Sequence, residues 1–140
     1  MGIYLNPGND GFKAIRKGTY VDKTGLIDYI NGTIDDASCR MTCFSRPRRF
    51  GKSFAAKMLC VYYDKSCDSH GLFDDLEIAG KPSYEEYLNK YDVIYLDITR
   101  FTSTAVMIKT VVRDIQEKVI AELRQSYLEY IKKDENIILD

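Results

Sequence analysis

One run of nine residues, 45–53, constrains this chain more than any other part of its sequence. It reads Ser-Arg-Pro-Arg-Arg-Phe-Gly-Lys-Ser, and it lies between a short apolar run at 41–44 and a helix-like run at 54–63. A short apolar strand, a tight loop ending in Gly-Lys-Ser and a following helix make up the phosphate-binding loop, or P-loop. The order of these segments therefore predicts a site for the phosphates of a nucleotide at the start of a helix.

The chemistry of the loop agrees with this interpretation. The first amides of a helix have no acceptor within the helix and carry partial positive charge. Gly51 would let the backbone approach a phosphate oxygen, Lys52 would reach the β- and γ-phosphates, and the Ser53 hydroxyl would ligate Mg²⁺. We therefore expect ATP and Mg²⁺ as cofactors. The predicted nucleotide-binding residues are Arg46, Arg48, Arg49, Phe50, Gly51, Lys52 and Ser53.

The charges in this loop give a second argument that does not depend on the motif. Four cations, Arg46, Arg48, Arg49 and Lys52, gather at the amino-terminal end of the expected helix, where the helix dipole disfavours positive charge. A bound polyanion would relieve that conflict. The full P-loop pattern is not met, because Arg46 stands where its first glycine belongs. Three alternatives stay open: a solvated basic loop, a loop that binds nucleic acid or a protein partner through its arginines, and a relic that keeps its shape without a ligand.

The composition of the chain argues against several other classes of function. A length of 140 residues fits one domain or part of one, and 20 basic residues against 21 acidic residues produce no overall field favouring nucleic acid. No apolar stretch is long enough to cross a bilayer and no signal peptide is visible, so we expect a cytoplasmic location without membrane contact. A zinc site from Cys39, Cys43, Cys67 and His70 would have spacings that match no standard finger, and reduced thiols are expected instead.

The pattern of apolar residues predicts an α/β fold with a mainly parallel sheet flanked by helices, similar to a P-loop NTPase and incomplete in this chain. Strands are expected at 41–45 and 92–98, the second as a central strand because its apolar run is continuous and β-branched. Short helices are predicted around 12–15, at 24–31 with Thr24 as N-cap, at 52–64 and at 82–88, and a helical turn is predicted within 70–76. A long helix is predicted from 103 or 104 to about 133. Ala56, Leu59 and Tyr63, with Ala55 beside them, mark the expected apolar face of helix 52–64.

Three further residues have both a functional and a structural interpretation. Asp97 ends the predicted strand 92–98, where an acidic residue could share Mg²⁺ with Ser53, or where it could simply cap the strand end. Asp22 and Lys23 form either an exposed turn pair or a contact with the nucleotide from outside the P-loop.

Four segments together resemble one known family. Residues 20–24, Tyr-Val-Asp-Lys-Thr, followed by 46–53, Arg-Pro-Arg-Arg-Phe-Gly-Lys-Ser, are similar to the bacterial AAA-ATPase-like family of predicted AAA ATPases. Residues 6–12 and 62–68 add to the likeness, and that family's loop also has arginine in place of the first glycine. The resemblance covers essentially the whole chain, with 1–40 as an extension carrying short helices and 41–140 as the beginning of the ATPase-like domain.

The resemblance implies a longer architecture, often followed by a nuclease-like domain of the PD-(D/E)xK kind. It also implies that the loop is a Walker A motif and that the Walker B strand lies downstream of residue 140. On that basis Asp97 ends a different strand. We then expect ATP binding without hydrolysis from this chain, because no complete Walker B motif is present.

Overall fold

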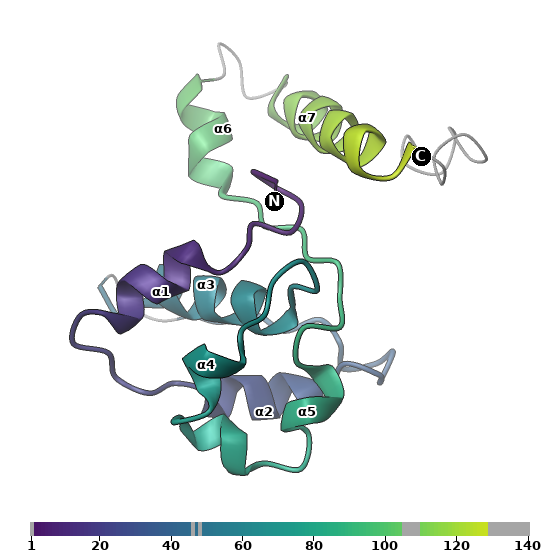
Figure 1. Ribbon diagram of the computed structural model, residues 1–140. Coiled ribbons are helices and arrows are strands. Elements are labelled where there is room, and N and C mark those ends of the chain that lie inside the picture. Colours follow the sequence, from purple (N-terminus) through teal and green to yellow (C-terminus); the bar gives the residue numbers. More distant parts are fainter. Residues whose placement is uncertain (1, 46, 48, 105–109, 129–140) are drawn as a thin grey trace.

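The structure is a computed structural model that describes residues 2–45, 47, 49–104 and 110–128, and its regular elements are helical (Figure 1). Six of the helices precede residue 90 and form one group, while α6 and α7 lie to one side of that group and contact each other (Figure 1). The elements are α1 (Asp10–Arg16), α2 (Gly25–Asn31), α3 (Lys52–Tyr63), α4 (His70–Phe73), the 3-10 helix η1 (Glu77–Gly80), α5 (Tyr84–Tyr87), α6 (Ile98–Thr104) and α7 (Val111–Ser126).

The predicted α/β fold with a mainly parallel sheet is wrong for the part of the chain that the structure describes. That part contains no β-strand, and its only ladder-like pairings are two isolated bridges, Leu5 with Ile94 (antiparallel) and Asp64 with Tyr91 (parallel). The expected strand 41–45 is an exposed irregular segment, with the Met41 side chain 93% accessible. An apolar run becomes a strand only when a neighbouring strand accepts its backbone hydrogen bonds, and no described segment forms a ladder with this run.

The expected central strand at 92–98 is an extended segment only through residue 97, where it pairs with the amino-terminal residues, and Ile98 already begins α6. The Asn6 amide donates to the Val93 carbonyl at 2.8 Å, the Tyr95 amide donates to the Tyr4 carbonyl at 2.8 Å, and the Val93 amide donates to the Asn6 Oδ1 atom. Ile94 and Ile98 are each about half exposed. The run is therefore not buried on both faces as a central parallel strand would be.

Most of the short helices are where the sequence predicts them. The predictions for the segments around 12–15, 24–31, 52–64, 70–76 and 82–88 are confirmed by α1, α2, α3, α4 and α5. The predicted long helix is wrong in its bounds, since α6 already begins at Ile98 and α7 ends at Ser126; residues 105–109 and 129–133 lie outside the described residues. No described helix has both the length and the apolar character that a bilayer crossing requires.

The core of the first group gathers around α3. This helix buries Met58, Val61, Tyr62 and Tyr63. Of the predicted face, Tyr63 is therefore confirmed as buried, whereas Ala55, Ala56 and Leu59 are only half-buried. The buried cluster comprises Phe12, Ile27, Met58, Val61, Tyr62, Tyr63, Phe73, Ile78, Tyr84, Tyr87 and Leu88. Aromatic rings supply much of the packing, and Phe12 stacks on Phe73 with ring centroids 5.2 Å apart.

A buried polar network joins α2 to α3 inside this core. The Asn31 side-chain amide donates to the Tyr62 hydroxyl at 3.1 Å, and the Tyr63 hydroxyl donates to the Asn31 Oδ1 atom at 2.7 Å. The Tyr62 hydroxyl in turn donates to the Tyr84 carbonyl at 2.8 Å. Each tyrosine therefore places its ring in the core while its hydroxyl keeps a hydrogen-bond partner, as buried polar groups require.

The amino-terminal segment holds α7 and α6 beside the extended segment. The Glu122 carboxylate of α7 accepts hydrogen bonds from the Ile3 and Tyr4 amides at 2.5 and 2.9 Å. The Tyr4 ring stacks on Phe101 of α6 at 5.5 Å. Residues far apart in sequence thus meet at the amino terminus.

Replacing Asn31 by alanine should destabilise the fold by about 2 kcal/mol, because the buried Tyr63 hydroxyl loses its acceptor. The same substitution in a Tyr63→Phe background should cost about 1 kcal/mol less, since no hydroxyl is then left without a partner. Urea denaturation of the four proteins measures both values. An equal cost of Asn31→Ala in the two backgrounds would show that this hydrogen bond does not stabilise the core.

Candidate functional site

The predicted phosphate loop ends in a sharp turn that leads directly into α3. Gly51 occupies the N-cap position of α3 with φ 72° and ψ 28°, and Arg49 also has a positive φ of 69°. The left-handed conformation suits glycine, which lacks a Cβ atom, and is costly for arginine. The Ala55 amide donates to the Gly51 carbonyl at 2.9 Å, so the helix is regular from its first turn.

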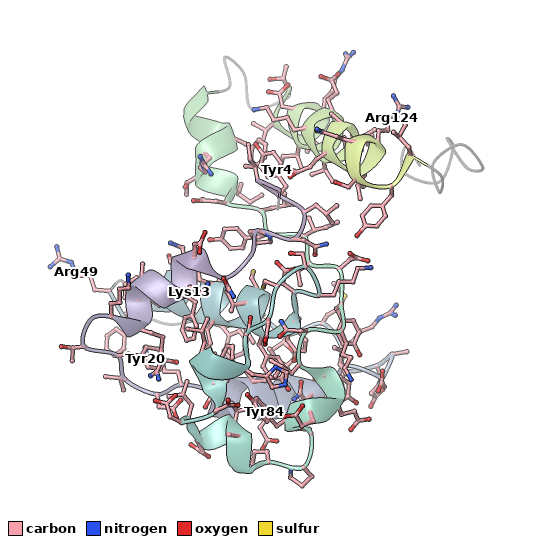
Figure 2. All side chains as sticks on the ribbon, viewed as in Figure 1. Tyr4, Lys13, Tyr20, Arg49, Tyr84 and Arg124 are labelled. Carbon is pink, nitrogen blue, oxygen red and sulfur yellow. The ribbon has the colours of Figure 1, made fainter. Side chains whose placement is uncertain are left out.

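The predicted site residues surround this helix start. Arg46 and Arg48 lie outside the described residues. Phe50, Lys52 and Ser53 are exposed, and Arg49 extends away from the body of the molecule (Figure 2). No side chain caps the helix and no acidic residue stands in its first turn. The amides at the start of α3 therefore keep their partial positive charge without an acidic residue in the first turn of the helix.

A lysine from a distant part of the sequence reaches the same turn. The Lys23 Nζ atom donates to the Phe50 carbonyl at 2.9 Å across a sequence separation of 27 residues. A Cβ atom added at Gly51 would lie 2.7 Å from that Nζ atom. The sequence left Lys23 open between an exposed turn and a role beside the P-loop, and the structure places it against the loop.

Two cavities flank the turn and share Lys23, Phe50, Gly51 and Ala55 in their walls. The larger has a volume of about 530 Å³ and the smaller about 360 Å³. Two lysines and otherwise apolar residues and a glycine line the larger cavity: Lys23, Leu26, Phe44, Phe50, Gly51, Lys52, Ala55, Ala56 and Leu59. Sequence reasoning missed Leu26 and Phe44 as site residues, because isolated apolar residues carry no signal that separates a cavity wall from a core.

Asp97 lies in neither cavity wall and has a local structural role. It directly precedes α6, and its carboxylate accepts hydrogen bonds from the Thr99 amide at 3.1 Å and the Thr99 hydroxyl at 2.5 Å. The hydroxyl of Thr99 is the main cause that holds the pKa of Asp97 below its ordinary value. The structure thus brings Lys52 and Ser53 together with the turn and leaves Asp97 at another helix start.

Comparison with models of known protein families shows which family the chain belongs to. The family model described as Predicted AAA-ATPase matches residues 7–138. The chain belongs to this AAA-ATPase-like family. No curated protein and no solved structure matches it. Membership spans the motif at 20–24 as well as the loop at 46–53, so the two segments that meet in the structure both lie within the matched region.

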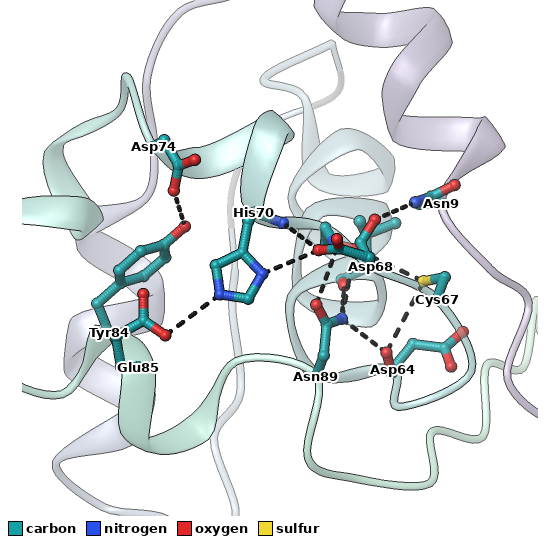
Figure 3. Close-up of polar contacts among 11 residues, drawn as sticks. Asn9, Asp64, Cys67, Asp68, His70, Asp74, Tyr84, Glu85 and Asn89 are labelled. Atoms are coloured by element: carbon teal, nitrogen blue, oxygen red, sulfur yellow. Dashed lines mark hydrogen bonds and ion pairs between the residues drawn. The ribbon is translucent and has the colours of Figure 1, made fainter.

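The second polar cluster of this AAA-ATPase-like chain surrounds its one histidine (Figure 3). The His70 ring lies between two carboxylates, with Nδ1 2.8 Å from Asp68 Oδ1 and Nε2 3.2 Å from Glu85 Oε2. The Cys67 thiol instead faces the Asp64 carbonyl at 3.7 Å, and burial raises the pKa of this thiol. Within the described residues, no group of three histidine, cysteine or acidic side chains is placed to hold a metal ion. These groups form a link between α4 and α5.

Gly51→Ala should destabilise the protein by about 1 kcal/mol, because alanine in the left-handed conformation brings its Cβ atom against the backbone. The nearby Lys23 end is flexible and can move aside, so the backbone strain is the main cost. Gly71→Ala is the matched control: an added Cβ meets nothing within 4 Å there, and alanine favours a helix. Thermal melting compares the two variants, and equal effects of both would contradict a left-handed Gly51.

The His70 contacts predict a small dependence of stability on pH. Hydrogen bonds that the His70 ring donates to the carboxylate of Asp68 first, and then to that of Glu85, raise the pKa of His70 above its ordinary value. A pKa raised in the folded state gives stability that is complete below the unfolded pKa and is lost as pH rises through the folded pKa. The melting temperature of wild type minus that of His70→Gln should therefore fall as pH rises from about 6 to about 8. A difference that stays constant across this range would contradict the prediction.

Proposed function

We propose that this chain binds the phosphates of ATP, together with Mg²⁺, through the loop 46–53 at the start of α3. The observation that carries the proposal is the left-handed turn at Gly51, which opens a 12-residue helix with Lys52 and Ser53 in its first turn. Membership of a family described as Predicted AAA-ATPase supports nucleotide use in general. The turn supports the more specific assignment of the phosphates to this loop.

The residues of the loop have separate roles in this proposal. Lys52 contacts the β- and γ-phosphates, the amides of residues 51–53 donate to phosphate oxygens, and the Ser53 hydroxyl is a ligand of Mg²⁺. Phe50 covers the turn, and Arg49 adds positive charge beside the phosphates, as Arg46 and Arg48 do in the sequence-based prediction. We leave Asp97 out of the proposed metal site because its carboxylate already accepts two hydrogen bonds from Thr99.

We further propose that binding by this chain is not followed by hydrolysis. ATP hydrolysis on a P-loop needs an acidic residue near the metal and a group that orients the attacking water. Among the described residues, neither cavity beside the turn has an acidic residue in its wall. The described walls of these two cavities thus offer groups that bind phosphate and no carboxylate that would activate water.

Calorimetric titration with ATP and Mg²⁺ tests the binding directly. Wild type should bind, and Lys52→Ala should bind about ten- to a hundredfold more weakly, because a charged hydrogen bond to phosphate is lost. Lys57→Ala is the matched control, since Lys57 is an exposed lysine of the same helix that lines neither cavity. Ser53→Ala should lose the gain in affinity that Mg²⁺ gives to wild type.

Two outcomes would contradict the proposal. One is the absence of ATP binding by wild type, and the other is equal binding by wild type and Lys52→Ala. DNA affinity that falls steeply with salt and does not change when ATP is added would instead favour the alternative, a loop that binds nucleic acid through its arginines. Arg49, which is exposed, is the arginine of that loop that the structure describes.

A further inference from the structure

We infer that Lys23 is a second binding residue for the nucleotide polyphosphate, supplied from outside the P-loop. This inference rests on the proposed function and adds to it a cation that the Gly-Lys-Ser motif does not contain. It is carried by the position of Lys23 beside Gly51, by the cavities that Lys23 lines and by the rigid turn that presents it.

The Lys23 ammonium lies beside the turn at which the proposed function places the phosphates. It contacts the Phe50 carbonyl at 2.9 Å and stands closest to the open side of Gly51, where a side chain would otherwise project. It also lines both cavities on either side of the turn. Because an ammonium has three N–H donors, Lys23 can keep its bond to Phe50 and donate a second one to a phosphate oxygen.

The two neighbours of Lys23 hold its backbone in place. The Asp22 carboxylate accepts hydrogen bonds from the Thr24 amide at 2.8 Å, the Thr24 hydroxyl at 2.7 Å and the Glu77 amide at 2.8 Å. Thr24 is fully buried, and its hydroxyl accepts from the Ile78 amide at 3.2 Å. The turn is thus fixed to α2 and η1, so Lys23 is the residue of this triplet left to face the loop.

The pKa of Asp22 agrees with the role of its carboxylate in holding this turn. Partial burial would raise its pKa, and the hydrogen bonds from Glu77 and Thr24 more than offset that effect and leave the pKa below its ordinary value. Asp22 therefore stays negatively charged near neutral pH while its oxygens are used within the turn. Among the described residues, no carboxylate lies within ion-pair distance of Lys23 itself, so the ammonium contacts a neutral carbonyl instead of an acid.

Binding of two ligands by four proteins tests the inference. Calorimetry with ATP and Mg²⁺, and with tripolyphosphate alone, compares wild type, Lys23→Met, Lys23→Arg and the control Lys90→Met, in which an exposed lysine outside both cavities is replaced. Lys23→Met should weaken both ligands about tenfold, because a charged hydrogen bond to phosphate is lost. Lys23→Arg should stay within about twofold of wild type, since the charge is retained, and Lys90→Met should equal wild type.

Salt dependence separates a phosphate contact from a purely structural support of the loop. If Lys23 contacts phosphate, the affinity of Lys23→Met should fall less steeply with added salt than that of wild type, because one cation fewer is screened. If it only supports the turn, the salt dependence should be unchanged. Circular dichroism establishes that each variant is folded, and Lys23→Gln is a second neutral replacement should the methionine variant precipitate.

Each contrary result has its own meaning. Wild-type binding with equal affinity for Lys23→Met overturns this inference and leaves the proposed function intact. A loss in Lys23→Arg as large as that in Lys23→Met, or an unchanged salt dependence, also overturns it. Absence of binding of both ligands to wild type overturns the inference and the proposed function together.

Discussion

The packing of α3 is the constraint on which the rest of the structure depends. One part of this helix places Met58, Val61 and Tyr62 in the core, where they meet residues of α1, α2 and α5. Because these contacts fix the helix axis, they also fix the direction in which its first turn and Gly51 face solvent. The energy that orients the candidate site therefore comes from apolar burial at the other end of the same helix.

The sequence predicts the helices well because their signals are local. Apolar spacing, helix-breaking residues and the position of Pro82 are enough to locate α1 to α5 to within a few residues. A sheet depends on partners that can lie anywhere in the chain, and a β-branched run such as 92–98 carries no information about what pairs with it. In this structure the amino-terminal residues are its hydrogen-bond partners, and one of these bonds is made by the side chain of Asn6. The same run is therefore extended without being a strand.

The residues of the candidate site also differ in whether the sequence alone could place them together. Gly51, Lys52 and Ser53 are contiguous, so a motif places them together without any knowledge of the fold. Lys23 meets them because the turn before α2 is hydrogen-bonded to η1 through Asp22 and Thr24. No spacing rule in the sequence predicts that long-range contact. Asp97 shows the reverse case: an acid after an apolar run suggests metal binding, yet the following Thr99 supplies two donors and makes it a helix cap. Local hydrogen bonding outcompetes a distant role at that position.

The Asn31 network has a spectroscopic consequence. The chain has 11 tyrosines and no tryptophan, so its near-ultraviolet absorption and intrinsic fluorescence come chiefly from phenol rings. Burial raises the pKa of Tyr62 to about 12, and it also raises the pKa of Tyr63 and Tyr84 well above the ordinary value of a phenol. In an alkaline titration followed by phenolate absorbance, these buried rings should therefore ionise late. Ionisation of Tyr62 removes the proton that it donates to the Tyr84 carbonyl, so the ultraviolet signal of this phenolate follows the loss of a hydrogen bond inside the core.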